Sequence, residues 1–159
     1  MLVNGRSLLT LEPIKDMHED KHKGHGVSYG LGEAGYDIRL AQDVTFHRGH
    51  GGDVNGAPFM GRFALASAME FFHMPVTLVG VVHDKSTWAR RGLSVFNTVI
   101  EPGWRGYLTL ELVYHGYEGM VIPAGSGIAQ VLFHEIANPA AYTGKYQNQE
   151  NEPVPARNS

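Results

Sequence analysis

The chain has 159 residues, with 13 Lys and Arg against 16 Asp and Glu and a formal net charge of −3. This balance gives no general basic field for nucleic acid and no polybasic membrane patch. The absence of cysteine excludes disulfides and thiolate metal sites, and no apolar stretch approaches the length of a membrane span. We expect one domain over residues 1–159 and, without a charged leader before an apolar stretch, a cytoplasmic location.

Short apolar segments alternate with Gly or Pro along the chain, which holds 20 Gly and 8 Pro. This pattern is typical of an all-β barrel or sandwich. We predict strands at Tyr36–Leu40, Val44–His47, Arg62–Ala66, Met69–Phe72, Thr77–His83, Ser94–Asn97, Gly106–Tyr114 and Gly127–Ile136. Residues 15–33 are expected to form a polar surface loop, in which three His are solvated rather than bound to metal, and residues 49–58 a long turn.

One short helix is predicted at Ser86–Arg91. Ser86 or Thr87 can cap its start, and Gly92 can end it in a left-handed conformation. Ser86 and Arg90 are four residues apart and therefore share one face of the turn. A hydroxyl, a guanidinium and the first amides of the helix would converge there, which predicts a phosphate or anion site.

The predicted strand Gly106–Tyr114 contains an acid. Alternation places Leu108, Leu110 and Leu112 on the core face and Glu111 on the opposite face. A solvated glutamate on a half-exposed sheet is the ordinary interpretation. The other interpretation is a partly desolvated carboxylate that lines a cleft or a subunit interface and acts as a base.

A collinear set of motifs over residues 34–155 resembles the dCTP deaminases, which belong to the dUTPase superfamily. Three motifs carry most of the resemblance: Ser-Thr-Trp-Ala-Arg-Arg-Gly-Leu at 86–93, Ile-Glu-Pro-Gly-Trp at 100–104, which also reads as a β-turn, and Gly-Tyr-Leu-Thr-Leu-Glu-Leu at 106–112. Four others flank them, at 34–40 (AGYDIRL), 63–66 (FALA), 123–130 (PAGSGIAQ) and 142–149 (YTGKYQNQ). Several motifs in order are far more specific than one.

The resemblance implies a β-clip fold, a distorted jelly-roll-like barrel with one short helix, that assembles as a homotrimer with active sites between subunits. It implies hydrolytic deamination of a deoxycytidine nucleotide, most of all dCTP to dUTP and ammonia, with Mg²⁺ on the triphosphate. Because the chain lacks cysteine, the His/Cys/Cys zinc route of other deaminases is closed, and we expect no protein-held metal. The C-terminal tail, residues 138–159, would close over the site.

The same resemblance implies roles for individual residues. Glu111 would activate the water that attacks C4 of cytosine, while Ser86 and Arg90 would hold phosphate and the water–base network. The substrate-binding residues would be Lys85 at the triphosphate, Thr87 beside Ser86, Thr98 or Val99 at the pyrimidine, Glu101 at the deoxyribose, and Tyr142, Lys145 and Gln149 in the tail.

Alternatives stay open at this point. One is a dUTPase, or a bifunctional enzyme that produces dUMP and pyrophosphate, although the tail lacks the Gly-rich arm of dUTPases. The other is a non-catalytic nucleotide-binding trimer, against which the retained Ser86, Arg90 and Glu111 argue. The segment between Leu93 and Glu101 is shorter than in the family pattern. The chain could therefore be a compact, phage-type member of the family, and its substrate could be a monophosphate or a nucleotide with a modified cytosine.

Overall fold

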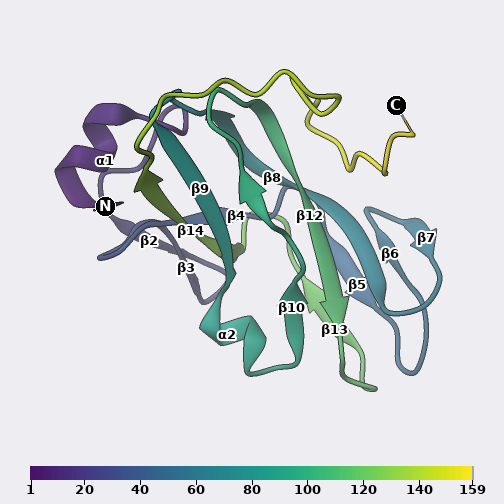
Figure 1. Cartoon of the computed structure of the whole chain (residues 1–159). Helices are drawn as coiled ribbons and strands as arrows, with labels where there is room; N and C mark the ends of the chain where they lie inside the picture. Colours follow the sequence, from purple (N-terminus) through teal and green to yellow (C-terminus); the bar gives the residue numbers. More distant parts are fainter. Residues whose placement is uncertain (159) are drawn as a thin grey trace.

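The structure, a computed structural model, describes residues 1–158. Within these residues the chain forms mainly strands joined by turns (Figure 1). The elements in chain order are β1 (Leu2–Val3), α1 (Gly5–Leu11), β2 (Lys21–Gly24), β3 (Val27–Leu31), β4 (Tyr36–Arg39), β5 (Val44–Phe46), β6 (Gly52–Val54), β7 (Ala57–Phe59), β8 (Phe63–His73), β9 (Leu78–Asp84), α2 (Ser86–Ala89), β10 (Leu93–Val95), β11 (Val99–Ile100), β12 (Arg105–Tyr114), β13 (Met120–Ile122) and β14 (Gly127–Glu135). The prediction of an all-β chain is confirmed.

The strands form three antiparallel sheets. The first has the order β11-β9-β14-β4-β3-β2, with β1 also paired to β14; the second has the order β10-β12-β8 and the third β13-β5-β6-β7. Figure 1 shows α2 at one end of the molecule and the C-terminal segment crossing the opposite end. The predicted site residues of α2 and of the tail therefore lie far apart within one chain.

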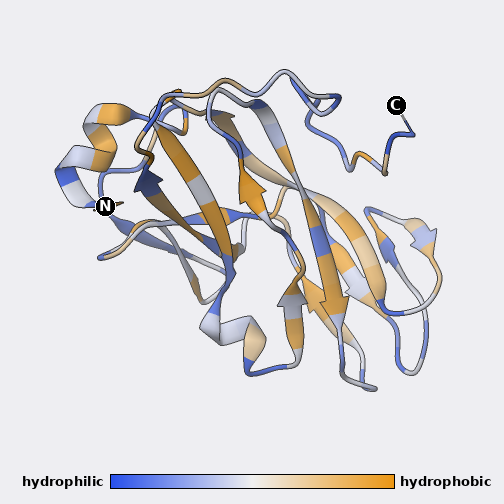
Figure 2. Cartoon of the chain, viewed as in Figure 1, coloured by the Kyte–Doolittle hydropathy of each residue, from blue (hydrophilic) through white to orange (hydrophobic). Residues whose placement is uncertain are grey.

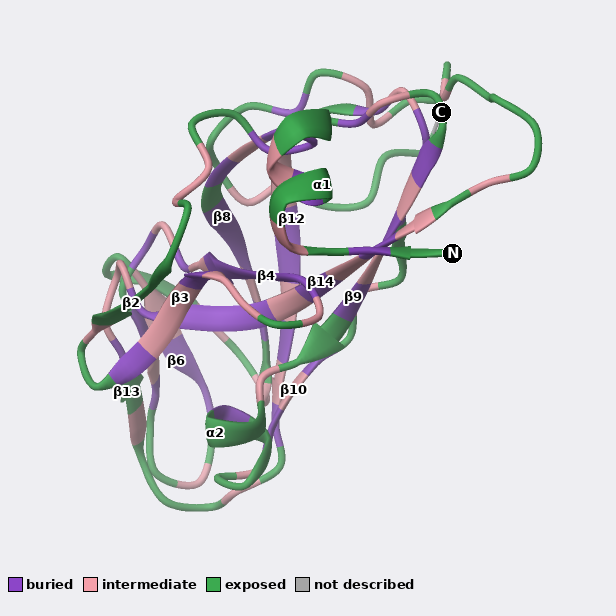
Figure 3. Cartoon of the chain, turned by 90° about the vertical axis from the view of Figure 1, so that its left-hand side faces the viewer, coloured by how far each residue is buried: buried purple, intermediate pink, exposed green. Residues whose placement is uncertain are grey.

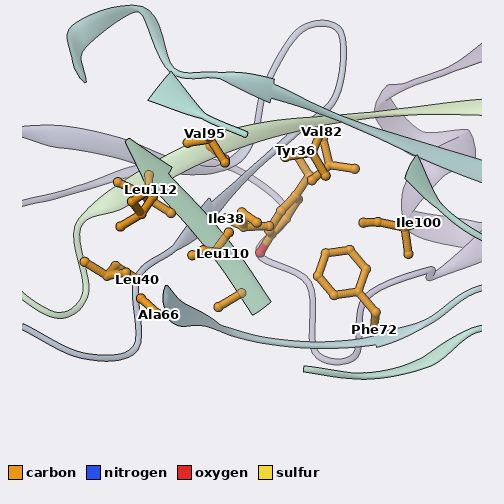
Figure 4. Packing of buried hydrophobic residues seen from close by; sticks show 14 of the residues in the cluster. Tyr36, Ile38, Leu40, Ala66, Phe72, Val82, Val95, Ile100, Leu110 and Leu112 are labelled. Carbon is orange, nitrogen blue, oxygen red and sulfur yellow. The ribbon is translucent and has the colours of Figure 1, made fainter. Parts of the chain in front are cut away.

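One apolar core joins the sheets. Apolar residues are concentrated on the long strands (Figure 2), and the same strands carry most of the buried residues (Figure 3). In Figure 4 the side chains of Ile38, Ala66 and Leu110 converge in the interior from β4, β8 and β12. Burying one large apolar side chain contributes about 1.5–3 kcal/mol. This core therefore gives a firm support to β12, the strand that carries Glu111.

Most predicted strands have counterparts, in β4, β5, β9, β10, β12 and β14, with ends that agree within two residues. The two strands predicted at Arg62–Ala66 and Met69–Phe72 are wrong, because they are one strand, β8. No Gly or Pro separates them, so the extended backbone continues. A bulge takes up the irregularity instead: residues 68–70 of β8 lie opposite the single residue Leu108 of β12.

Two predicted irregular segments are hairpins. The expectation of a loop over residues 15–33 is wrong where β2 pairs with β3, and the expectation of a long turn over residues 49–58 is wrong where β6 pairs with β7. Each hairpin is closed by two residues with positive φ, which are His25 and Gly26 in the first and Asn55 and Gly56 in the second. All four strands have five residues or fewer, and β2 and β6 are largely polar, so backbone pairing forms the hairpins without a regular apolar alternation.

The short helix predicted at Ser86–Arg91 is present as α2, and α1 is a second short helix that the sequence did not predict. Leu8 is the one buried residue of α1, and no side chain caps its start, so its sequence carries little helical signal. α2 is shorter than predicted, and Lys85 rather than Ser86 or Thr87 occupies its N-cap, again without a side-chain cap. Gly92 has the expected left-handed conformation, with φ of 88°. In the part of the chain that is described, neither helix is long and apolar enough to cross a membrane.

Candidate active site

Glu111 lies on β12 with its side chain turned away from the core. Leu110 and Leu112 on either side of it are fully buried, whereas Glu111 is half-buried. Desolvation raises the pKa of the Glu111 carboxyl above its ordinary value, and no other group shifts that pKa. This carboxyl therefore holds a proton more readily than a solvated glutamate does. Of the two interpretations of the sequence, the structure favours the partly desolvated carboxyl.

A side chain from the segment before β11 fixes the backbone around Glu111. The side-chain oxygen of Asn97 accepts a hydrogen bond from the Glu111 amide (2.9 Å), and its side-chain nitrogen donates to the Thr109 carbonyl (2.7 Å). The Phe96 amide donates to the Glu111 carbonyl (2.7 Å). Asn97 thus pairs with β12 much as the backbone of a neighbouring strand would. The position of Glu111 is therefore set from two sides, by its own ladder with β8 and by this contact.

Glu111 faces a cavity of about 510 Å³ between β12, the residues that lead into β11, and the C-terminal tail. Six of the eleven predicted site residues line it, namely Thr98, Val99, Glu101, Glu111, Tyr142 and Gln149. The other lining residues are mostly apolar or aromatic, namely Phe63, Leu65, Val82, Asn97, Ile100, Trp104, Leu108, Thr109, Tyr146, Val154 and Ala156. Within residues 1–158, no Lys or Arg lines the cavity. Its size and mainly apolar walls suit a small organic molecule.

The turn that precedes β12 forms one wall. The Trp104 amide donates to the Glu101 carbonyl (3.2 Å), and Gly103 has φ of 73°, as a type II turn requires at that position. The β-turn predicted from these residues is confirmed. The Pro102 carbonyl accepts a hydrogen bond from the Tyr142 amide (2.8 Å). The turn therefore also anchors the start of the tail.

The tail docks on β12 beside this turn. Gly106 forms a parallel bridge with Gln149, and the Tyr107 amide donates to the Gln149 carbonyl (3.0 Å). A β-carbon on Gly106, whose φ is 139°, would lie 2.6 Å from the Gln149 nitrogen, so this approach requires glycine. The Thr109 hydroxyl donates to the side-chain oxygen of Gln149 (3.3 Å) and accepts from the Val154 amide (3.1 Å). Gln149 is consequently buried against the strand that carries Glu111.

The other five predicted residues lie outside the cavity: Lys85, Ser86, Thr87, Arg90 and Lys145. Trp88 is buried and its Nε1 donates to the Gly127 carbonyl (2.7 Å), which holds α2 against the sheet. Ser86, Thr87 and Arg90 are left exposed. Neither Ser86 nor Arg90 lines the cavity that Glu111 faces, so one chain does not place these two side chains at the cavity.

Lys85 takes part in an internal ion pair. Its Nζ lies 2.6 Å from Oδ2 of Asp37 and donates to the Ser28 hydroxyl at 2.9 Å. The side chains of Lys85 and Asp37 are both mostly buried. The pair joins the start of α2 to β3 and β4, so within one chain Lys85 positions α2. Its contact with a triphosphate stays a prediction.

Residues 1–158 contain no cluster of three or more His, Cys, Asp or Glu side chains that could hold a metal ion. Glu101 and Glu111 are the two carboxylates of the cavity. In the predicted His-rich loop, the rings of His18 and His22 lie 5.4 and 5.6 Å from the ring of Tyr29. These histidines therefore pack on an aromatic neighbour at the surface of the first sheet.

The sequence did not assign the eleven other lining residues to the site, and three of them bear on how it is built. The expectation that Leu108 shares the core face of Leu110 is wrong in part, because the bulge opposite Leu108 shifts the alternation and leaves it half-buried at the cavity. Thr109 and Asn97 act through contacts with segments distant in the sequence. Asn97 is the last residue of the strand predicted at Ser94–Asn97, which gives no signal of its contact with β12, and nothing in the local sequence distinguishes Thr109.

Residues 59–136 match a family model described as dCTP deaminase-like. A dCTP deaminase of Campylobacter curvus is 36% identical over 159 residues, which cover 86% of this chain and 86% of the relative.

Two solved structures show the same fold. A dCTP deaminase of Agrobacterium tumefaciens superposes with a TM-score of 0.56 at 18% identity, covering 86% of this chain and 49% of that chain. The EIAV dUTPase superposes with a TM-score of 0.53 at 17% identity, covering 92% of this chain and 99% of that chain. At these identities the likeness concerns the fold alone, and it confirms the predicted fold of the dUTPase superfamily.

Proposed function

The chain belongs to the dCTP deaminase-like family, and from this premise we propose that it catalyses the hydrolytic deamination of dCTP to dUTP and ammonia. The Glu111 carboxyl is the observation that carries the proposal. It is partly desolvated and turned towards a cavity that also holds Thr98, Val99 and Glu101. The pyrimidine would lie against Thr98, Val99 and Glu111, and the deoxyribose against Glu101.

In the proposed reaction Glu111 takes a proton from water while the water oxygen bonds to C4 of cytosine. The protonated carboxyl then gives this proton to the amino nitrogen, the C4–N bond breaks, and ammonia leaves. The second proton of the water, on the oxygen now bonded to C4, moves to N3 of the ring as the C4=O bond forms, and Glu111, which has given up its proton, is again ionised. A raised pKa supports this role, because the carboxyl must hold the proton between the two steps.

A second copy of the chain would complete the site. The cavity carries two carboxylates and no Lys or Arg of residues 1–158, although a nucleotide triphosphate needs cations. Ser86 and Arg90 are exposed and lie outside the cavity of the same chain. A homotrimer in which each α2 meets the cavity of the next copy would supply the missing hydroxyl and guanidinium to the phosphates and the water. Lys85 and Thr87 would come with them.

Mg²⁺ would reach the site as part of the substrate. The described residues offer no three-ligand cluster, and Mg²⁺ is commonly bound through substrate phosphates with few protein ligands. The tail, residues 138–158, would close over the nucleotide through Tyr142, Lys145 and Gln149. Two of these three side chains already line the cavity, which supports this role.

The test is to incubate the protein with dCTP, dCMP or dUTP in the presence of Mg²⁺ and to measure ammonia and pyrophosphate separately. We expect ammonia from dCTP. Glu111→Gln should abolish nearly all of it while nucleotide binding is retained, because the amide keeps the shape of the side chain but accepts no proton. Glu118→Gln is the matched control, since Glu118 lies in an exposed ion pair with Arg48.

Each other outcome changes the proposal in a defined way. Ammonia from dCMP alone would keep the deamination and change the substrate to the monophosphate. Pyrophosphate from dUTP without any ammonia would overturn the proposal in favour of a dUTPase. Nucleotide binding without either product would identify a non-catalytic binding protein.

A further inference from the structure

Two cations of the C-terminal tail share one aromatic ring. The Nζ of Lys145 lies 5.3 Å from the centre of the Tyr146 ring, and Cζ of Arg157 lies 5.9 Å from it. Three hydrogen bonds hold this arrangement. Arg157 Nη1 donates to the Lys145 carbonyl (2.6 Å), Lys145 Nζ donates to the Arg157 carbonyl, and the Arg157 amide donates to the Tyr146 hydroxyl (3.1 Å).

In the described part of the chain no carboxylate compensates these two charges. Neither Lys145 nor Arg157 forms an ion pair with a carboxylate of residues 1–158. An anion that binds both side chains would gain charge-assisted hydrogen bonds from an ammonium and a guanidinium. The hydrogen bonds to backbone carbonyls use only part of the donors of each side chain. The remaining donors are available to a ligand.

The pair also lies at the edge of the cavity. Tyr146 and Ala156, the neighbours of the two cations in the sequence, both line it. The cavity itself is lined by the carboxylates of Glu101 and Glu111 and by no basic residue of the described chain. Lys145 and Arg157 therefore lie around a ring, that of Tyr146, which itself forms part of the cavity wall.

We propose that Arg157, together with Lys145, forms a clamp for the phosphate chain of the bound nucleotide. The inference rests on the proposed function and adds Arg157 to the substrate-binding residues. The two flexible cations suit an extended polyphosphate better than a single phosphate, because its charge is spread over several groups. The clamp would thus contribute to the selection of a triphosphate over a monophosphate.

The test compares the wild type with Arg157→Gln, Arg157→Lys and Tyr146→Phe, with Arg48→Gln as an exposed control. The probe is inorganic tripolyphosphate, titrated by calorimetry. We expect Arg157→Gln to raise the dissociation constant of tripolyphosphate, and the KM for dCTP, about tenfold, the loss of one charge-assisted hydrogen bond. The kcat and the dissociation constant of dCMP should not change. Arg157→Lys should lie in between, and Tyr146→Phe, which loses the hydroxyl that holds Arg157, should show part of the effect.

Unchanged binding of tripolyphosphate in Arg157→Gln overturns the clamp, whether or not the protein deaminates dCTP. A loss of kcat without a change in KM also overturns it, because it would place Arg157 in the chemistry or in the folding of the tail. The wild type could release no ammonia and still bind tripolyphosphate, with Arg157→Gln weakening this binding. That result would support the clamp and overturn the proposed deamination. The two ideas therefore fail separately.

Discussion

The Glu111 amide donates a hydrogen bond to the side-chain oxygen of Asn97 at 2.9 Å, and this contact joins the proposed catalytic strand to the residues that would face the pyrimidine. The side-chain nitrogen of Asn97 donates a second hydrogen bond, to the Thr109 carbonyl, and these two contacts together are called the Asn97 bracket. One side chain thus fixes both the carboxyl-bearing residue and the neighbouring Thr98 relative to each other.

Asn97→Ala removes both hydrogen bonds of this bracket. Because a half-buried amide and carbonyl of β12 then lose their partner, we expect the free energy of unfolding to fall by about 2 kcal/mol. We also expect kcat to fall, since Glu111 is no longer held. Urea unfolding and ammonia release measure the two effects. Asn138→Ala, at an exposed position, is the control, and equal behaviour of the two variants would contradict the bracket.

Glu111→Gln should be more stable than the wild type at neutral pH. Burial raises the pKa of this carboxyl in the folded state. The folded protein therefore holds the Glu111 proton more tightly than the unfolded chain does. The stability that this carboxyl contributes is fully present below its unfolded-state pKa and is lost as the pH rises through its folded-state pKa. The amide does not ionise, so the variant avoids this loss. Unfolding free energies should differ at neutral pH and converge in acid, and a variant less stable than the wild type at neutral pH would refute this.

The same raised pKa predicts the pH dependence of activity. Glu111 must be ionised to accept the proton of water, so the acid limb of kcat/KM should lie at a higher pH than that of a solvated glutamate. Asn97→Asp places a negative charge beside Glu111 and should move this limb further towards neutral pH. A limb at the ordinary glutamate value would argue against Glu111 as the base.

Gly106→Ala should undock the tail. Its β-carbon would lie 2.6 Å from the Gln149 nitrogen, and the mobile partner is the tail. Gly56→Ala is the control, since Gly56 also has a positive φ but a β-carbon there meets nothing within 4 Å. Both variants should lose about 1 kcal/mol from the backbone conformation. Only Gly106→Ala should speed hydrogen exchange over residues 142–158 and raise the KM for dCTP.

Mixed assemblies test whether the site is shared. Arg90→Ala and Glu111→Gln should each be inactive alone. When equal amounts are unfolded together and refolded, roughly a quarter of the wild-type activity should return, because one site in four would join an intact Glu111 to an intact Arg90 of another copy. If both residues acted within one chain, the mixture would stay inactive.

Glu70→Gln should destabilise the fold without a direct effect on the site. Glu70 lies within the β8 bulge, is almost fully buried, and accepts hydrogen bonds from Nε and the amide of Arg39, both at 2.8 Å. Loss of its charge leaves the guanidinium of Arg39 unpaired in a largely buried position, which should cost about 3 kcal/mol. Glu33→Gln breaks an exposed pair with Lys21 and should change the unfolding transition far less.

The sequence predicts those parts of the fold in which burial imposes a pattern. The alternation in β12 places Glu111 opposite Leu110 and Leu112, and these three positions are as expected. The β2–β3 and β6–β7 hairpins were not predicted, because their short strands carry no clear apolar pattern. The local signal for these hairpins lies in their turns, above all in Asn55-Gly56. The bulge opposite Leu108 depends on pairing between strands about 40 residues apart, which no local pattern encodes.

The predicted site residues fall into two groups for a similar reason. Motif resemblance assigns Ser86, Arg90 and Glu111 to one site, but a motif carries no information on which copy of a chain supplies each residue. Of these three residues only Glu111 lines the cavity of its own chain, and a shared site between copies stays a prediction. Asn97 and Thr109 could not be predicted, because their role depends on contacts with distant backbone.

The two tryptophans of the chain give it a built-in optical reporter. Trp104 donates from Nε1 to the Tyr146 carbonyl (2.6 Å), so release of the tail would expose its indole to water and alter its emission. Trp88 is fixed to Gly127 at the other end of the molecule and would report on α2 instead. With Trp88 replaced by Phe, intrinsic fluorescence would follow the opening and closing of the tail in real time, without any attached dye.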